Sequence, residues 1–234
     1  FTENAYGLAQ TPGDRAYQQD DCGVDFGVDI PSGARKGCTP DILAVLADGM
    51  GGEAAGDVAA RIAVETFLDA YAANRWSDTP ERLHKALLHA NREIGLRIEA
   101  NAAYQGMGCT LVALMIGASG AHWIAVGDSI LWHYRSGRLT RLNADHSYGA
   151  ALDDLVALGR MDAEAAANSP DRNILTSALA GERIEKIDRN EKAYPVKSGD
   201  YFLLASDGLL SLQDADIIAT LTRLPEPQAA AEAL

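Results

Sequence analysis

The sequence predicts an α+β fold in which helices pack on antiparallel β-sheets. Short apolar runs of strand character alternate with two long stretches that have the three-and-four spacing of an amphipathic helix. Several of the apolar runs are joined by connections of only a few residues that contain glycine. Connections this short form hairpins, because parallel strands need crossovers of a dozen or more residues. The pattern is therefore that of separate sheet and helix layers and excludes a Rossmann alternation.

Five apolar runs are predicted to be strands. They cover residues 41–47, 110–116, 122–126, 130–134 and 201–205. The second and third are separated by Gly-Ala-Ser-Gly, and the fourth is followed by Arg-Ser-Gly-Arg, so both connections read as hairpin turns.

Two adjacent helices are predicted over residues 53–73 and 79–100, each with an apolar stripe. Thr79 is the expected N-cap of the second helix, with Pro80 at the first helical position. Residues 145–190 are polar, rich in Asp and Ala and weakly periodic, and we expect them to form a flap over one end of a sheet. The 234 residues show no internal repeat and suit one domain.

Charge and cysteine content narrow the classes of partner. The net charge of −13 disfavours nucleic acid and anionic membranes as partners. The excess carboxylates either keep the protein soluble or cluster around a hard cation. No apolar run reaches the length of a membrane span, and no leader peptide is visible. The three widely spaced cysteines Cys22, Cys38 and Cys109 fit a reducing cytoplasm and indicate neither a disulfide framework nor a zinc site.

Aspartate follows an apolar strand three times. The predicted strands ending near residues 47, 126 and 205 lead to Asp48, Asp128 and Asp207, each followed by a small residue. Any one of them alone is explained as a turn former. Three together indicate carboxylates gathered at one end of a sheet, which repel one another unless a cation such as Mg²⁺ or Mn²⁺ binds between them. The sequence thus predicts a carboxylate metal site.

Two further segments extend this candidate site. Residues 48–52 read DGMGG, where glycines let a backbone carbonyl approach a ligand, although a flexible turn is the simpler explanation. Arg15 lies five residues before Asp20. Arginine suits bidentate contact with a phosphate, and most single arginines are ordinary surface residues.

Several motifs in order resemble those of the 2C-type metal-dependent serine/threonine protein phosphatases, in the form found in the bacterial branch. The motifs are RAYQQD at 15–20, ADGMGG at 47–52, GMGCTL at 106–111, VGDS at 126–129, DHS at 145–147, PDRNILTSAL at 170–179 and SDGL at 206–209. The resemblance implies two antiparallel sheets packed face to face with helices outside, an α-β-β-α sandwich, and a single phosphatase catalytic domain over residues 1–234.

The resemblance also implies a binuclear Mn²⁺ or Mg²⁺ centre and a possible third ion. Asp48 would bridge the two core ions, the Gly49 carbonyl would bind one and Asp207 the other. Asp20 would act through bound waters, Asp128 would hold a weaker third ion, and Arg15 would bind the substrate phosphate. A metal-bridged hydroxide would then hydrolyse phosphoserine and phosphothreonine in proteins that serve signal transduction, with a cognate Ser/Thr kinase as a possible partner.

Four features of the sequence depart from the family pattern. Gln18 replaces an asparagine, and Cys109 stands where threonine is common, which we interpret as a packing change. Met50 replaces the histidine that some relatives place in this loop, and a closing Asp-Asn-x-Thr motif is absent. The last departure predicts a longer natural chain with an additional metal-binding Asp. It also leaves open an alternative function, a non-catalytic regulatory or binding module of the same fold within a larger signalling protein. An aspartyl-nucleophile phosphohydrolase is disfavoured, because Asp48-Gly49-Met50 lacks the Asp-x-Asp that such enzymes carry.

Overall fold

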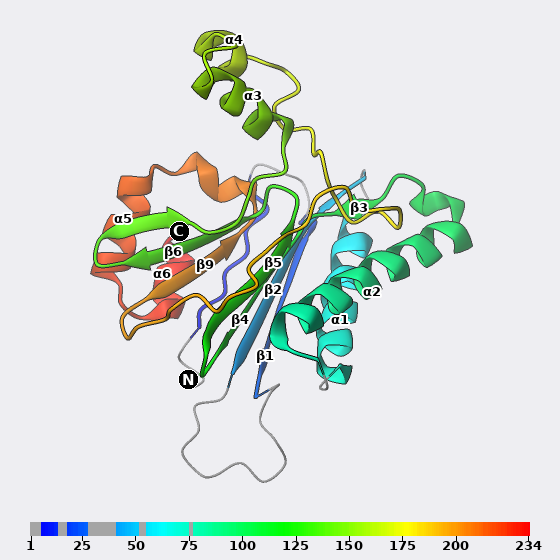
Figure 1. Cartoon of the computed structure of the whole chain (residues 1–234), viewed down its shortest axis with the longest axis horizontal. Helices are drawn as coiled ribbons and strands as arrows, with labels where there is room; N and C mark the ends of the chain where they lie inside the picture. Colours follow the sequence, from blue (N-terminus) through cyan, green and yellow to red (C-terminus); the bar gives the residue numbers. More distant parts are fainter. Residues whose placement is uncertain (1–5, 14–17, 28–40, 52–54, 75–76) are drawn as a thin grey trace.

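Two antiparallel β-sheets lie face to face between two layers of helices (Figure 1). The computed structural model describes residues 6–13, 18–27, 41–51, 55–74 and 77–234. The four-layer α-β-β-α sandwich expected from the family resemblance is confirmed.

The larger sheet has the order β1-β2-β4-β5-β8, with β3 pairing to the end of β2. All five predicted strands are present in the two sheets, but β2 is longer than expected. It runs through Asp48 to Met50, so Asp48 lies inside a strand and not after one. The pairing of Asp20 with Asp48 and of Gly49 with Cys109 carries the ladder past that point. The strands of this sheet are β1 Asp20–Phe26, β2 Ile42–Met50, β3 Gly108–Cys109, β4 Leu111–Gly117, β5 Gly120–Val126 and β8 Asp188–Arg189.

The smaller sheet has the order β7-β6-β9, formed by β7 Arg138–Arg141, β6 Ile130–Arg135 and β9 Tyr201–Ala205. Both predicted hairpins are confirmed, since β4 pairs with β5 and β6 with β7 across short turns. The β6–β7 turn places Ser136 and Gly137 at φ 51° and 79°. Two successive positive φ values match the right-handed twist of a tight hairpin.

Helices cover the outer face of each sheet (Figure 1). On the larger sheet lie α1 Gly56–Ala73 and α2 Thr79–Ala100, and on the smaller lie α5 Asp214–Arg223 and α6 Pro227–Ala233. The predicted N-cap Thr79 is wrong by one residue. Asp78 caps α2, because its carboxylate accepts from the Glu81 N–H at 3.0 Å and Thr79 already has helical geometry. The first two residues of the predicted helix 53–73 lie outside the described residues.

Three apolar cores separate the four layers, and the alternation of strand side chains explains how. In β4, Leu111 and Ala113 face α1 and α2, whereas Val112 and Leu114 face the second sheet. In β6, Leu131 points between the sheets while Trp132 packs toward α5. Strands buried on both faces read as nearly continuous apolar runs, which is how they appear in the sequence.

Residues 145–190 form an excursion with two short helices, α3 Tyr148–Ala157 and α4 Ala163–Ala167, which project beyond the end of the sheets (Figure 1). The chain then returns along the larger sheet through β8. Ser147 caps α3 by accepting from the Ala150 N–H at 3.1 Å. Two short 3-10 helices, Ala102–Tyr104 and Asp207–Ser211, complete the regular structure of the described residues. None of the helices described is long and apolar enough to cross a membrane.

An ion pair between a buried carboxylate and a partly exposed arginine stabilises the smaller sheet at the end of β6. Arg135 donates to both carboxylate oxygens of Asp200, with 2.6 Å from Nε to Oδ1. The Asp200 side chain is only 2% exposed, and His133 Nε2 lies 3.3 Å from its Oδ2. The Arg135 hydrogen bonds lower the pKa of Asp200 to about 2. Because the folded-state pKa lies below the unfolded value, the ionised carboxylate stabilises the fold above about pH 4.

We expect Asp200→Asn to lower the melting temperature at pH 7 by roughly 5 °C or more. The difference from the wild type should shrink as pH falls from 4 toward 2, where Asp200 becomes protonated in both states. Asp153→Asn is the matched control, because Asp153 also binds an arginine, Arg172, through both oxygens but is 61% exposed. Solvent screens that pair, so its loss should cost about 2 °C or less. Equal effects of the two variants in thermal unfolding would contradict this assignment.

Candidate functional site

Three strands converge where aspartates were predicted to gather. Asp20, the first residue of β1, lies directly opposite Asp48 of β2 in the antiparallel register. The Asp20 Oδ2 atom also accepts a hydrogen bond from the Ser206 hydroxyl at 2.9 Å. Ser206 follows β9 of the other sheet and immediately precedes Asp207. The Asp20–Ser206 bond therefore joins the two sheets at the end that carries the acidic residues.

Asp128 approaches Asp207 from the turn between β5 and β6. Burial raises the pKa of Asp128 to about 6, and the negative charge of Asp207 adds to the shift. Asp145 acts in the same direction, while the Arg141 guanidinium opposes it. Asp128 and Asp207 thus follow their strands as predicted. The four aspartates Asp20, Asp48, Asp128 and Asp207, which are far apart in sequence, are brought to one end of the sandwich.

Gly49 lies in a space that admits no side chain. A Cβ atom at Gly49 would lie 2.2 Å from the Gly56 carbonyl oxygen and 2.6 Å from that of Gln19. The Gly49 N–H donates to the Gln19 carbonyl at 3.2 Å, which fixes the backbone between Asp48 and the start of α1. Glycine is needed here because of the close approach of two other backbone segments.

The residues present fit a divalent cation of the hard type. Their donor set consists of carboxylate and backbone oxygens, which Mg²⁺ and Mn²⁺ prefer. Within the described ranges, no three His, Cys, Asp or Glu side chains are grouped closely enough to hold an ion by themselves. Mg²⁺ commonly keeps several waters and binds through one or two carboxylates, so paired aspartates with a nearby backbone carbonyl suit it.

The turn that carries Asp128 is held by side chains that the sequence analysis did not single out. Arg141 donates to the Asp128 carbonyl at 2.8 Å and forms an ion pair with Asp145 at 3.0 Å. Asn143 donates to the Ser129 carbonyl at 2.8 Å. The sequence motifs pointed to this turn only indirectly, because Ser129 follows the motif residue Asp128 and Asp145 is the first residue of the DHS motif.

Arg15, the predicted phosphate ligand, lies outside the described residues, as does Cys38. Gln18, which stands in place of asparagine, folds back on its own backbone. Its Oε1 accepts from the Gln19 N–H at 3.1 Å and from the Asp20 N–H at 3.4 Å. The longer amide thus still reaches the backbone at the start of β1.

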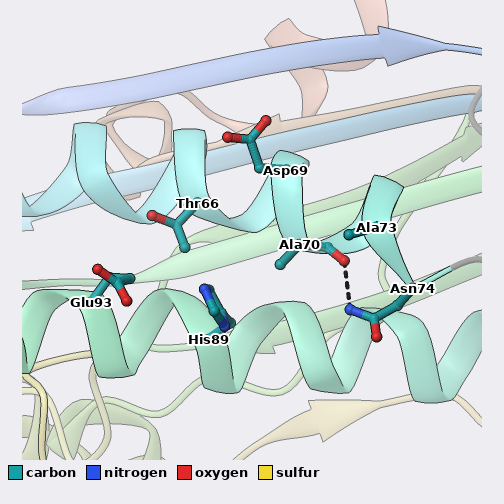
Figure 2. A pocket seen from close by; sticks show the side chains of 7 residues that line it. All are labelled: Thr66, Asp69, Ala70, Ala73, Asn74, His89 and Glu93. Atoms are coloured by element: carbon teal, nitrogen blue, oxygen red, sulfur yellow. Dashed lines mark hydrogen bonds between the residues drawn. The ribbon is translucent and has the colours of Figure 1, made fainter.

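A separate groove of about 410 Å³ lies between α1 and α2 (Figure 2). His89 and Glu93 of α2 lie across this groove from Thr66 of α1, and Asp69 of α1 also lines it, with its carboxylate turned away from α2 (Figure 2). The groove lies on the outer side of a helix layer, and the four converging aspartates do not line it. We therefore place the candidate site at the strand ends and not in this groove.

The sequence pattern of the family described as "Protein phosphatase 2C" matches residues 17–234 of this chain. The chain belongs to the protein phosphatase 2C family. The resemblance found in the sequence motifs is confirmed by this match, which covers most of the described residues and all four converging aspartates.

Two relatives that are named as serine/threonine phosphatases support the assignment of this chain to the family. The chain is 31% identical over 184 residues to the serine/threonine protein phosphatase PstP of Mycobacterium tuberculosis, covering 79% of this chain and 35% of PstP. It is 36% identical over 174 residues to the serine/threonine phosphatase stp of Listeria monocytogenes, covering 73% and 67%. The chain thus spans about a third of the length of PstP and two thirds of that of stp.

Solved structures of this family superpose on the fold. The crystal structure of Mycobacterium tuberculosis PstP/Ppp matches with a TM-score of 0.72 and 30% identity, covering 97% of this chain and 86% of that one. The PstP catalytic domain in complex with two manganese ions matches with a TM-score of 0.70 and 29% identity, covering 97% and 85%.

We expect Asp48→Asn to weaken Mn²⁺ binding at least tenfold in calorimetric titration while the metal-free melting temperature stays within about 2 °C of the wild type. The amide keeps the shape of the side chain in β2 but removes a charge beside Asp20. Asp25→Asn removes a charge from the opposite end of β1 and is the matched control. Equal Mn²⁺ affinities in the two variants would rule out Asp48 as a ligand.

We expect Asp128→Ala to leave the tightest Mn²⁺ binding in place and to remove or weaken a looser binding phase. The physical reason is that Asp128 comes from a turn separate from the Asp20–Asp48 ladder. The measurement is a calorimetric titration extended to millimolar Mn²⁺. Loss of the tightest phase would reverse the division of roles between Asp128 and Asp48.

Proposed function

We propose that this chain is a metal-dependent phosphoprotein phosphatase that hydrolyses phosphoserine and phosphothreonine. The observation that carries the proposal is the gathering of Asp20, Asp48, Asp128 and Asp207 at one end of a protein phosphatase 2C fold. On this proposal residues 1–234 belong to one catalytic domain, with residues 145–190 as a flap beside the site.

Mn²⁺ or Mg²⁺ would be held by Asp48, by the Gly49 carbonyl and by Asp207. Such ions lower the pKa of water and so supply a nucleophile at neutral pH. The two manganese ions in the PstP catalytic domain support two core ions here. Asp20, whose carboxylate already accepts from Ser206, would orient the surrounding waters, and Asp128 would serve a weaker third position.

Arg15 would bind the phosphate of the substrate. A guanidinium offers paired N–H donors to two phosphate oxygens and neutralises the charge that they carry. It also makes the local potential less negative in a chain whose net charge is −13, and so lets an anionic phosphate approach. Its position five residues before Asp20 supports this role, because Asp20 lies in the acidic cluster.

The proposed substrates are phosphorylated Ser/Thr proteins, and a cognate Ser/Thr kinase is the proposed partner in signalling. The names of the relatives, which are serine/threonine phosphatases of bacteria, support this class of substrate. The presence together of Arg15, Asp20, Asp48, Asp128 and Asp207 argues against the alternative of a non-catalytic regulatory module.

The direct test is hydrolysis of a phosphothreonine peptide with Mn²⁺, with Mg²⁺ and after chelation of divalent cations. We expect phosphate release that requires the cation and disappears in Asp48→Asn. Calorimetric Mn²⁺ binding without any hydrolysis of phosphothreonine or phosphoserine peptides would instead favour the non-catalytic module.

We expect Arg15→Ala to raise KM for the phosphopeptide roughly 30-fold, the loss of about 2 kcal/mol of charge-assisted hydrogen bonding, with Mn²⁺ binding retained. Arg15→Lys should recover part of the loss, because it restores the charge without the bidentate geometry. Arg61→Ala, which removes an exposed arginine from α1, is the control. Unchanged steady-state kinetics in Arg15→Ala would make Arg15 an ordinary surface residue.

A further inference from the structure

On the side of β2 that faces β3 and β4, the ladder is interrupted beside Asp48, whereas on the other side β1 pairs with β2 at that residue. β2 pairs with β4 up to Leu46 and Val112, and with β3 from Gly49 and Cys109 onward. Between these two ladders the Thr110 N–H donates to the Asp48 carbonyl at 2.9 Å. The Asp48 N–H in turn donates to the side-chain hydroxyl of Thr110 at 3.0 Å. At Asp48, the Thr110 hydroxyl oxygen thus accepts the hydrogen bond that a backbone carbonyl of the neighbouring strand would accept in a regular ladder.

The same hydroxyl reaches the turn that carries Asp128. Thr110 Oγ1 and Ser129 Oγ are 2.6 Å apart, and both residues are 2% exposed. The residue that precedes Asp128 in this turn, Gly127, also packs closely against the Thr110 side chain. Gly127 has φ +98°, and a Cβ atom there would lie 2.6 Å from the Thr110 methyl carbon. Thr110 therefore contacts the residues on both sides of Asp128 and the backbone of Asp48.

We propose that Thr110 and Ser129 act as a positioning pair that fixes the Asp128 turn relative to Asp48 and so sets how cations bind at both. This inference rests on the proposed function and concerns residues to which the sequence motifs assign no role. Both hydroxyls are buried, so water cannot readily replace either partner, and an unpaired hydroxyl or N–H is left if one is removed. The contact between Thr110 and Ser129 joins the Asp128 turn to the backbone of Asp48, so its loss lets the turn shift relative to Asp48.

The structure predicts distinct effects for the two hydroxyls. Ser129→Ala should weaken the looser Mn²⁺ phase about tenfold and leave the tighter phase unchanged, since Ser129 contacts only the Asp128 side. Thr110→Val should weaken both phases, because its hydroxyl also accepts from Asp48. Thr110→Ser keeps the hydroxyl and should restore near-normal binding. The double variant Thr110→Val with Ser129→Ala should be no worse than Thr110→Val alone, since the two side chains form one interaction.

The experiment is calorimetric Mn²⁺ titration of each variant, with thermal unfolding of the metal-free protein alongside. Ser177→Ala is the matched control, because Ser177 is also a buried serine whose hydroxyl makes two hydrogen bonds, both to the backbone of Lys186. The pair is supported if Ser129→Ala changes the looser Mn²⁺ phase and Ser177→Ala does not. It is overturned if Ser129→Ala and Ser177→Ala alter only thermal stability, or if the effects of the two single variants multiply in the double variant.

Two features keep the test decisive. If Thr110→Val does not fold, Ser129→Ala and Thr110→Ser still decide between the outcomes. The metal titration also separates this inference from the proposed function. Wild-type protein that binds Mn²⁺ but hydrolyses no phosphopeptide would overturn the phosphatase proposal, while the variants would still report on the pair.

Discussion

Mutual repulsion among aspartates at one end of the sandwich is the constraint around which the rest of the structure is organised. Asp20 and Asp48 lie opposite each other in a ladder, and the charge of Asp207 helps to raise the pKa of Asp128. In a chain of net charge −13, such crowding opposes folding unless rigid elements impose it. The three apolar cores provide that rigidity, because they lock the strands carrying these residues against each other and against the helices.

Uncharged hydroxyl groups and a glycine fix the positions of the aspartates. Ser206 bonds Asp20 across the two sheets, and the Thr110–Ser129 pair connects Asp48 with the Asp128 turn. Gly49 allows the chain to pass between two other backbone segments. Neither a hydroxyl nor a glycine adds a charge. These contacts therefore fix the positions of the carboxylates without changing the negative electrostatic potential that the carboxylates produce. A cation arriving at this end of the sandwich would thus meet preorganised oxygen ligands.

Much of the fold could be predicted from the sequence, because strands buried on both faces leave continuous apolar runs and helices leave a periodic stripe. The same signals could not locate β1, whose seven residues include three aspartates and a glycine, or the two-residue strands β3 and β8. Asp48 was expected after a strand because aspartate is rare inside one, yet the pairing with Asp20 and Thr110 keeps it in β2. The converging acids could be anticipated from their motifs, whereas the Thr110–Ser129 contact depends on the sheet register and the β5–β6 turn, which no local pattern encodes.

The claim on which this account depends is that divalent cations bind where the strands of the two sheets meet. Anomalous diffraction at the manganese edge, from crystals of this chain grown with Mn²⁺, measures that most directly. The account predicts strong peaks beside Asp48, the Gly49 carbonyl and Asp207, with any weaker peak beside Asp128. Manganese found instead in the α1–α2 groove near Asp69, His89 and Glu93, with none at the strand ends, would contradict it.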